Sequence, residues 1–232
     1  VWWNLNTALR QVGRTAEAIE RSWIAFELIS KSPHIPVILP TPTPPPPPET
    51  CASPIVIACL KWGTKYDASS VNRLFFGCQR HLQGVNHSFV CLTEDSTGLD
   101  PNIKVVALPT SKTMKGWWYK AYLFSDLCFA SIGMQHSRIV YIDLDTVLVG
   151  ALTEVASYQG LFGTLGTEGI SNEHREGGLN SSVMIWTDGT FGEIWKQLEL
   201  NFVHLSQLTY KFDHWLEMLL NQNADRLQSL FP

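Results

Sequence analysis

The sequence predicts an α/β fold in which a mostly parallel sheet is flanked by helices, with a helical hairpin in front of it. Three observations support this prediction. From residue 54 onward, short apolar runs of β-type residues alternate with amphipathic stretches, which is typical of parallel sheets with crossover helices. One such run, residues 139–142, ends in two acids that are one residue apart. A proline-rich stretch separates this region from N-terminal residues with helical periodicity.

Residues 1–32 predict two short amphipathic helices, the first over residues 2–12 and the second starting near Thr15. This hairpin resembles one tetratricopeptide (TPR) repeat. The residues that match the spaced positions of that motif are Trp2, Leu5, Ala8, Gly13, Ala18 and Ala25, with Pro33 near its end. A single repeat cannot bury its apolar face, so the resemblance implies further repeats before Val1 and a protein partner. A plain helical hairpin without a partner is the alternative.

Residues 33–51 predict a linker, since they are dense in proline and contain an unbroken run from Pro44 to Pro48. Proline fixes φ and lacks the N–H, so the segment is expected to be an extended spacer. A ligand for an SH3-type domain is the alternative. Residues 52–232 form the main domain, and we expect this domain to be truncated at Pro232.

The main domain alternates strands and helices. Strands are predicted at residues 54–60, 89–92, 103–108, 139–142 and 182–186. Helices are predicted from Asp67 or Ser69 onward and at residues 117–130, 152–158, 191–198 and 215–220. Residues 163–180, which are rich in Gly, Thr, Ser and Asn, predict a long polar and mobile segment.

Composition and charge exclude some classes of protein. The net charge of -4 argues against a non-specific nucleic-acid binder, which would carry a basic patch. No apolar run reaches the roughly 18 residues that a membrane span needs. The five cysteines form no CxxC pair, and Cys59, Cys91 and Cys128 lie in apolar runs, where a thiol packs as a small hydrophobe. This pattern favours a reducing compartment such as the cytoplasm, but the odd count leaves the localisation open.

Asp143 and Asp145 are the first candidate functional residues. The buried run before them delivers both acids to the C-terminal edge of the sheet, where open α/β sheets bind ligands. Two carboxylates at that edge suit a divalent cation, which prefers oxygen ligands and can carry phosphates. Acids that merely cap the turn after the strand are the alternative.

Four stretches in a fixed order extend this hypothesis. They are residues 61–66 (KWGTKY), 116–120 (GWWYK), 143–145 (DLD) and 179–184 (LNSSVM). Over roughly residues 54–220, this order resembles the GT-A fold nucleotide-diphospho-sugar transferases, nearest the glycogenin-like retaining glycosyltransferases. The resemblance implies transfer of a sugar from a nucleotide donor, with a UDP-sugar favoured, to an acceptor that the sequence does not identify.

The resemblance also implies catalytic and metal-binding roles. Asp143 and Asp145 would hold Mn²⁺ or Mg²⁺, and the cation would offset the charge that builds on the leaving diphosphate. Lys120 would reach a phosphate or sugar oxygen as a point charge. A solvated helix lysine is the alternative reading of Lys120.

Substrate-binding residues follow from the same resemblance. Tyr66 would stack on the base, with Trp62 beside it, unless it only anchors its loop. Asn180 would hydrogen-bond sugar hydroxyls, with Ser181 next to it, unless it is a turn residue before the strand. Asp213 stands where the family has the acid of a Gly-Asp-Gln motif, here Phe-Asp-His.

The sequence departs from the family at the third metal ligand, a late histidine. His204 and His214 precede its expected place, so the ligand is expected beyond Pro232, and His174 is expected at the surface. Two alternatives for function remain. The run from Asp143 to Val147 also fits the opening motif of haloacid-dehalogenase-type phosphatases, in which the first Asp is a nucleophile. A non-catalytic TPR scaffold with a degenerate transferase domain is the other alternative.

Overall fold

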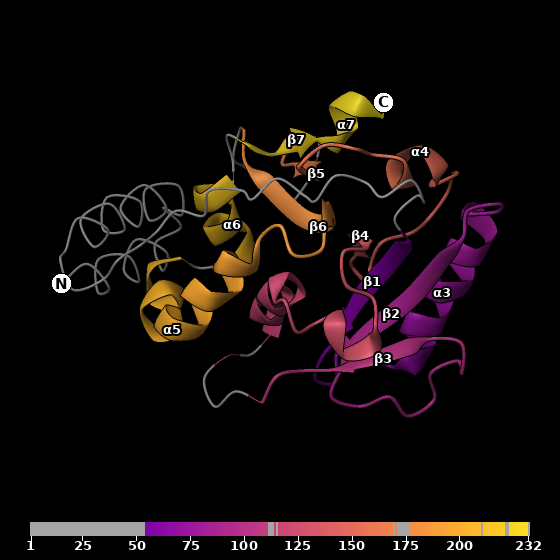
Figure 1. The fold of residues 1–232 in the computed structure, drawn as a ribbon, viewed down its shortest axis with the longest axis horizontal. Coiled ribbons are helices and arrows are strands. Elements are labelled where there is room, and N and C mark those ends of the chain that lie inside the picture. The colour runs from indigo at the N-terminus through magenta and orange to yellow at the C-terminus, as the bar shows by residue number, and fades with distance from the viewer. Residues whose placement is uncertain are drawn as a thin grey trace.

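A computed structural model describes residues 54–231 apart from 111–113, 115, 169, 171–176, 210 and 221–222. The TPR-like hairpin and the linker lie outside the described residues, as does His174. The described part is a three-layer α/β domain built on a seven-stranded sheet in the order β3-β2-β1-β4-β6-β5-β7 (Figure 1). None of the helices described is long and apolar enough to cross a membrane.

The first half of the sheet is parallel, as the sequence predicts. β1 (Ile55–Lys61) pairs in parallel with β2 (His87–Thr93) on one side and with β4 (Arg138–Ile142) on the other, and β2 pairs in parallel with β3 (Lys104–Ala107). Helix α3 (Ala68–His81) makes the crossover from β1 to β2, and its first turn is capped by Asp67, whose carboxylate accepts from the Ser70 amide at 3.1 Å.

The second half of the sheet reverses direction. β6 (Leu179–Thr187) runs antiparallel to both β4 and β5 (Phe162–Gly166), and the two-residue β7 (Asp225–Arg226) pairs in parallel with β5. Because β6 is antiparallel to β4, the beginning of β6 lies beside the end of β4. The predicted mobile segment is therefore wrong at both ends, since residues 162–166 and 179–180 belong to strands.

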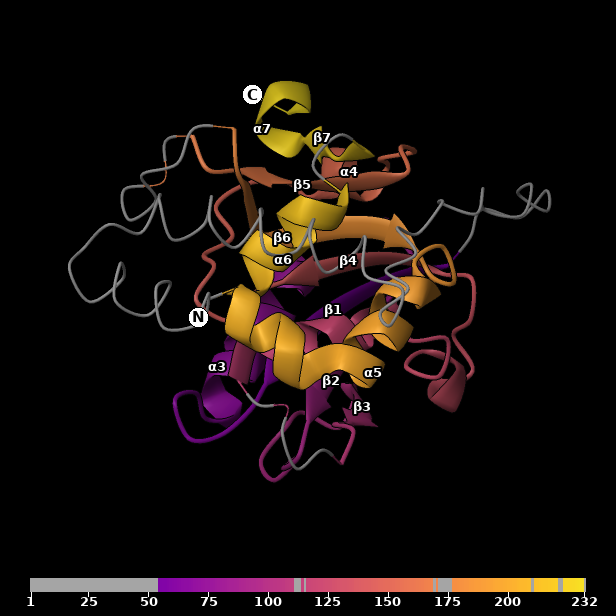
Figure 2. The ribbon, with the colours of Figure 1, turned by 90° about the vertical axis from the view of Figure 1, so that its left-hand side faces the viewer.

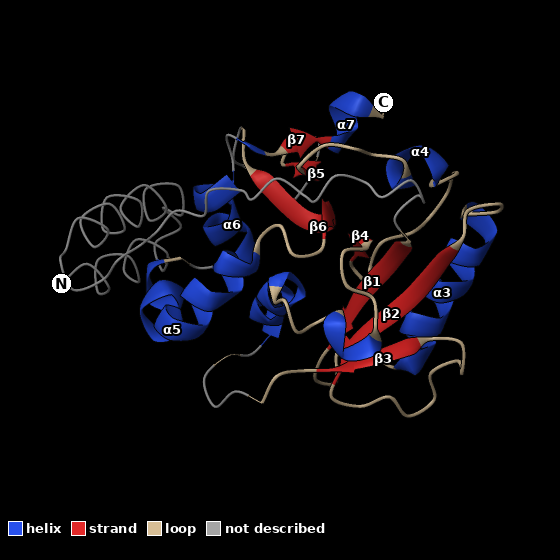
Figure 3. Cartoon of the chain, in the orientation of Figure 1, coloured by secondary structure: helices blue, strands red, loops and turns tan. Residues whose placement is uncertain are grey.

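Helices cover both faces of the sheet (Figure 3). In Figure 2, α5 (Gly192–Leu208) and α6 (Phe212–Leu220) lie in front of the strands. The opposite face carries α3 and two short helices, α4 (Thr153–Ala156) and α7 (Leu227–Leu230). Alternate strand residues enter opposite core layers: Val56 and Ala58 pack toward the side of α5 and α6, whereas Ile57 and Cys59 pack toward α3.

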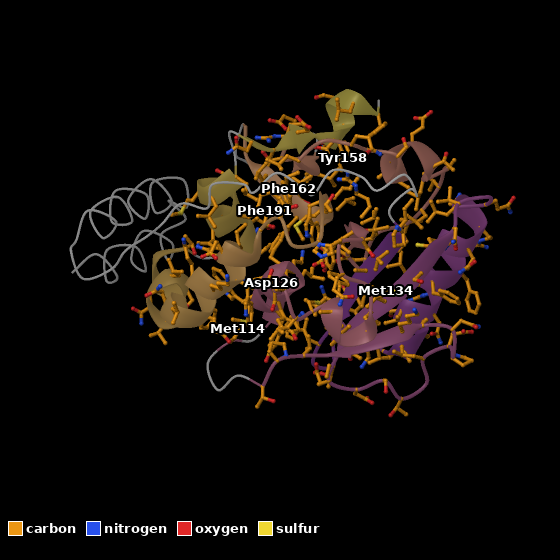
Figure 4. The ribbon with its side chains drawn as sticks, in the orientation of Figure 1. Met114, Asp126, Met134, Tyr158, Phe162 and Phe191 are labelled. Atoms are coloured by element: carbon orange, nitrogen blue, oxygen red, sulfur yellow. The ribbon has the colours of Figure 1, made fainter. Side chains whose placement is uncertain are left out.

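The aromatic residues are concentrated in the layer between the sheet and α5 and α6. Phe162 and Phe191 face each other edge to face, with ring centroids 5.6 Å apart (Figure 4). The ring centroids of Phe124 and Trp186 are 4.8 Å apart, and both side chains are fully buried. The predicted buried thiols are confirmed, because Cys59, Cys91 and Cys128 all have no exposed surface.

One predicted helix has a different form. Residues 117–130 are not a continuous α-helix but begin as a 3₁₀ helix, η1 (Gly116–Phe124), followed by turns and a second short 3₁₀ helix, η2 (Ala130–Ile132). The 3₁₀ period of three residues places Trp118, Ala121 and Phe124 on one buried face. The neighbouring row of the same helix, residues 117, 120 and 123, contains Lys120, which is only 8% exposed.

Candidate active site

The end of β4 places the two acids, and they differ in environment. The Asp143 amide donates to the Ser182 carbonyl at 2.8 Å, which continues the β4–β6 pairing by one residue, and the Thr146 amide then closes a turn onto the Asp143 carbonyl at 3.1 Å. The side chain of Asp143 is 22% exposed, whereas that of Asp145 is 60% exposed. Asp143 thus belongs to the floor of the site and Asp145 to its rim.

Both carboxylate oxygens of Asp143 are engaged. Tyr141, two residues earlier on the same face of β4, donates its hydroxyl to Oδ1 at 2.5 Å. Lys120 donates from Nζ to Oδ2 at 2.8 Å. Burial, followed by the nearby charge of Asp143, raises the pKa of Tyr141 well above its usual value, so this phenol stays protonated and donates.

A chain of hydrogen bonds links Lys120 to α6. Lys120 Nζ also donates to the Ser181 carbonyl at 3.3 Å and to the Ser181 hydroxyl at 3.0 Å. Ser181 in turn donates its amide to Asp213 Oδ1 at 3.1 Å and its hydroxyl to the same oxygen. Asp213 lies in the first turn of α6, where the helix dipole favours a negative charge. The network therefore fixes η1, β6 and α6 around Asp143.

Asp145 is held only at the surface. Tyr66 donates its hydroxyl to Asp145 Oδ2 at 2.9 Å, and Lys65 Nζ lies 3.9 Å from the same oxygen. The pKa of Lys65 is raised, chiefly through its interaction with Tyr66, and its ammonium lies 4.6 Å from the centroid of that ring. These contacts connect the loop after β1 to the loop after β4.

All of the predicted site residues line one cavity of about 330 Å³ at the C-terminal edge of β1 and β4. They are Trp62, Tyr66, Lys120, Asp143, Asp145, Asn180, Ser181 and Asp213. The topology brings them together, because β1 and β4 end at this edge and the antiparallel β6 begins there. Asn180 also accepts the Ser182 amide at 3.0 Å through its side-chain oxygen, which orients the amide group.

Sequence reasoning missed seven further residues of the cavity wall, and three of them, Lys65, Trp117 and Lys211, could contact a ligand through a charge or an indole ring. Lys65 and Trp117 lie inside stretches that the sequence singles out, so their positions could have been proposed from it. Lys211 precedes α6 and lies in no motif or periodic pattern. The lining of the cavity thus contains three lysines, Lys65, Lys120 and Lys211, and three carboxylates.

The donor set agrees with a divalent cation held by few protein ligands. Among the residues that the structure describes, no group of three or more His, Cys, Asp and Glu side chains could hold a metal ion. Asp143 and Asp145 supply hard carboxylate oxygens, and Mg²⁺ in particular is commonly held by one or two carboxylates with water and substrate phosphates completing its shell. The residues present therefore fit such a cation. His214 is buried in α6 and does not line the cavity, and the His204 side chain is outside the described part.

Comparison with family models and with curated proteins finds no match to this sequence. Solved structures do match it. The glycosyltransferase GlyE of Streptococcus pneumoniae aligns with a TM-score of 0.54 and 13% identity over 78% of this chain. The galactosyltransferase LgtC, in complex with donor and acceptor sugar analogs, aligns with a TM-score of 0.50 and 10% identity over 74% of this chain and 72% of LgtC. The chain has a GT-A glycosyltransferase fold.

The predicted GT-A fold is thus confirmed. The matched region spans only 46% of GlyE. Since one fold supports many reactions, the activity of this GT-A domain has to be argued from its own cavity.

Proposed function

We propose that the chain is a metal-dependent glycosyltransferase of the glycogenin-like type that transfers a sugar from a UDP-sugar to an acceptor hydroxyl. The observation that supports this most is the convergence of one buried lysine, two carboxylates, an asparagine and aromatic side chains on a single cavity. The bond between the anomeric carbon and the diphosphate oxygen breaks, a bond from that carbon to the acceptor oxygen forms, and the proton of the acceptor hydroxyl passes to the departing diphosphate. The nucleoside diphosphate is the leaving group.

Each residue of the cavity has a role that depends on its position. Lys120, fixed by Asp143 and Ser181, presents a positive charge at the cavity floor, where developing negative charge on a phosphate or sugar oxygen is stabilised without reorganisation. Asn180 offers donor and acceptor groups to sugar hydroxyls. Tyr66 and Trp62 supply flat apolar surfaces on which a base can stack.

The divalent cation would be held by Asp145 and Asp143 and, when bound, would neutralise charge on the diphosphate. Asp143 already receives hydrogen bonds at both oxygens, whereas at Asp145 one oxygen accepts from Tyr66. Asp145 is therefore the residue of the pair that is freer to bind a cation. We infer retention of the anomeric configuration from the resemblance to the glycogenin-like family alone.

The test is the binding of UDP to the full chain with and without Mn²⁺, measured by isothermal titration calorimetry. Asp145→Asn is expected to lower the Mn²⁺-dependent affinity for UDP at least tenfold, while the circular dichroism spectrum stays unchanged. Glu154→Gln is the matched control, because Glu154 is an exposed carboxylate on α4 outside the cavity. Undiminished UDP affinity in Asp145→Asn would refute the assignment, and absence of UDP binding in the native chain would favour the scaffold alternative.

A further inference from the structure

A second cavity adjoins the proposed donor site. It has a volume of about 490 Å³ and lies between α3 and the loop that follows Asp143, residues 144–148. Tyr66, Leu144 and Asp145 line both cavities. We call the second cavity the α3 groove, and define it by Arg73, Phe76, Gly77, Arg80, Val147 and Leu148. A ligand in the α3 groove would therefore reach the rim of the proposed active site at Asp145.

The walls of the α3 groove are held in place. Leu148 packs over Gly77 so closely that a Cβ at Gly77 would meet Leu148 Cδ1 at 3.3 Å. The loop is fixed at its far end by the Leu152 amide, which donates to the His81 carbonyl at the end of α3 at 2.9 Å. Close approach at Gly77 and this backbone bond keep the loop along the helix, which makes the groove a preformed feature.

The α3 side of the groove is basic and apolar, and the acidic residue of the lining, Asp145, lies where the groove meets the first cavity. Arg73 and Arg80 are two helical turns apart on one face of α3, so their positions are separated by about 10.5 Å along the axis. Helix α3 contains no acidic residue. In the part of the chain that the structure describes, neither arginine forms an ion pair with a carboxylate, and Arg73 donates only to the Ser70 hydroxyl, at 3.2 Å.

Large apolar side chains lie exposed beside these arginines. Phe76 is 51% exposed and Val147 is 79% exposed, and they belong to opposite walls of the groove. An occupant that matches both features carries carboxylates spaced to meet Arg73 and Arg80 and apolar groups between them. An alternation of this kind is the pattern of an extended peptide, in which neighbouring side chains point to opposite faces.

We propose that the α3 groove binds an acidic peptide segment of a protein acceptor and guides its hydroxyl to the active site. This inference rests on the proposed transferase function and adds to it the class of acceptor. The helix between Ala68 and His81 has 14 residues, so its length of about 21 Å would accommodate roughly six extended residues at about 3.3 Å each. Carboxylates would pair with Arg73 and Arg80, and apolar side chains would cover Phe76 and Val147.

The test uses fluorescence anisotropy with the full chain and a labelled octapeptide in which Glu alternates with Leu and the last residue is Ser. The same peptide with Lys in place of Glu is the charge control. The acidic peptide is expected to bind and the basic one is not. The double variant Arg73→Glu, Arg80→Glu is expected to bind the acidic peptide about tenfold more weakly or worse, because two ion pairs become repulsive contacts. Lys104→Glu, which makes the charge reversal of one of these substitutions at an exposed position on β3, is the control and is expected to have no effect.

Titration of UDP with Mn²⁺ on the same samples separates the two proposals. If UDP binds but the acidic peptide does not, or binds equally to the double variant, the acceptor inference is wrong and the transferase proposal stands. If UDP binds to neither protein, the transferase proposal fails, whatever the peptide does. The peptide assignment would also be overturned if an acidic oligosaccharide or phosphatidylserine vesicles bind where the peptide does not, and if this binding disappears in the double variant.

Discussion

The ion pair between Lys120 and Asp143 allows a quantitative prediction. The two side chains are 10% and 22% exposed, and their charged atoms are 2.8 Å apart. Replacement of Lys120 by Met preserves much of the side-chain length and apolar stem but removes the charge. Asp143 would then keep only the hydroxyl of Tyr141 as a direct partner, and the Ser181 carbonyl would lose a donor.

Removal of one partner from a buried ion pair costs about 3–5 kcal/mol, because the other charge stays uncompensated. Asp143 retains some contact with water, so we expect the lower end of this range, about 3 kcal/mol, for Lys120→Met. In a chain that already carries Asp143→Asn no charge is left unpaired, and the cost of Lys120→Met is expected to fall by about 2 kcal/mol.

The assay is urea unfolding at pH 7 of the native chain, both single variants and the double variant, followed by tryptophan fluorescence. Lys196→Met is the matched control. Lys196 pairs with Glu193 at 2.7 Å, yet the two side chains are 54% and 50% exposed, so its loss is expected to leave the free energy of unfolding nearly unchanged. A cost for Lys120→Met no larger than that of the control, or a coupling energy near zero, would refute the view that Lys120 holds Asp143.

Two further predictions concern other buried groups. Asp188 is 4% exposed, and burial raises its pKa to about 6 from 3.8; the folded state therefore binds the proton more tightly, and the stability from this group is lost as the pH rises from about 4 to about 6. In urea unfolding, the Asp188→Asn variant is expected to be about 2 kcal/mol more stable than the native chain at pH 7 and about equally stable near pH 4. Equal stabilities of the two chains at pH 7 would contradict this prediction. The thiols described by the structure should also resist iodoacetamide at pH 8, since burial raises the pKa of Cys78 to about 12 and of Cys59 and Cys128 well above the usual value. Mass spectrometry that finds rapid modification of these residues before urea is added would contradict the structure.

The parallel half of the sheet could be predicted from sequence because each strand there is a compact apolar run. β1, β2 and β4 are buried on both faces, so their residues are apolar almost without interruption. The carboxylates after β4 are equally predictable, since the strand itself dictates the edge at which they appear. The strands predict the α/β class, whereas the GT-A fold was predicted from the resemblance that the four motif stretches carry.

β5 could not be predicted, because Phe162–Gly166 contains two glycines and lies in a polar region. Tertiary packing leaves little space for a side chain at one of them, since a Cβ at Gly163 would come within 2.8 Å of Leu227 Cδ2. The 3₁₀ form of η1 was missed for a similar reason, since its buried rows are defined by packing against α5 and α6. Lys211 was missed because it reaches the cavity wall only through the position of α6 in the folded domain, which the sequence does not show.

The two acids of the DLD motif are equivalent in sequence, but the fold makes them different. β4 is paired on both sides, with parallel β1 and antiparallel β6, so the residue that directly follows it is still held by a strand hydrogen bond. Asp143 occupies that position, faces η1, and receives both Tyr141 and Lys120. Asp145 lies within the turn that follows, and its printed side-chain partners among the described residues, Tyr66 and Lys65, both belong to the loop after β1. We therefore expect substitution of Asp143 to affect stability and the position of Lys120 first, and substitution of Asp145 to affect cation binding first.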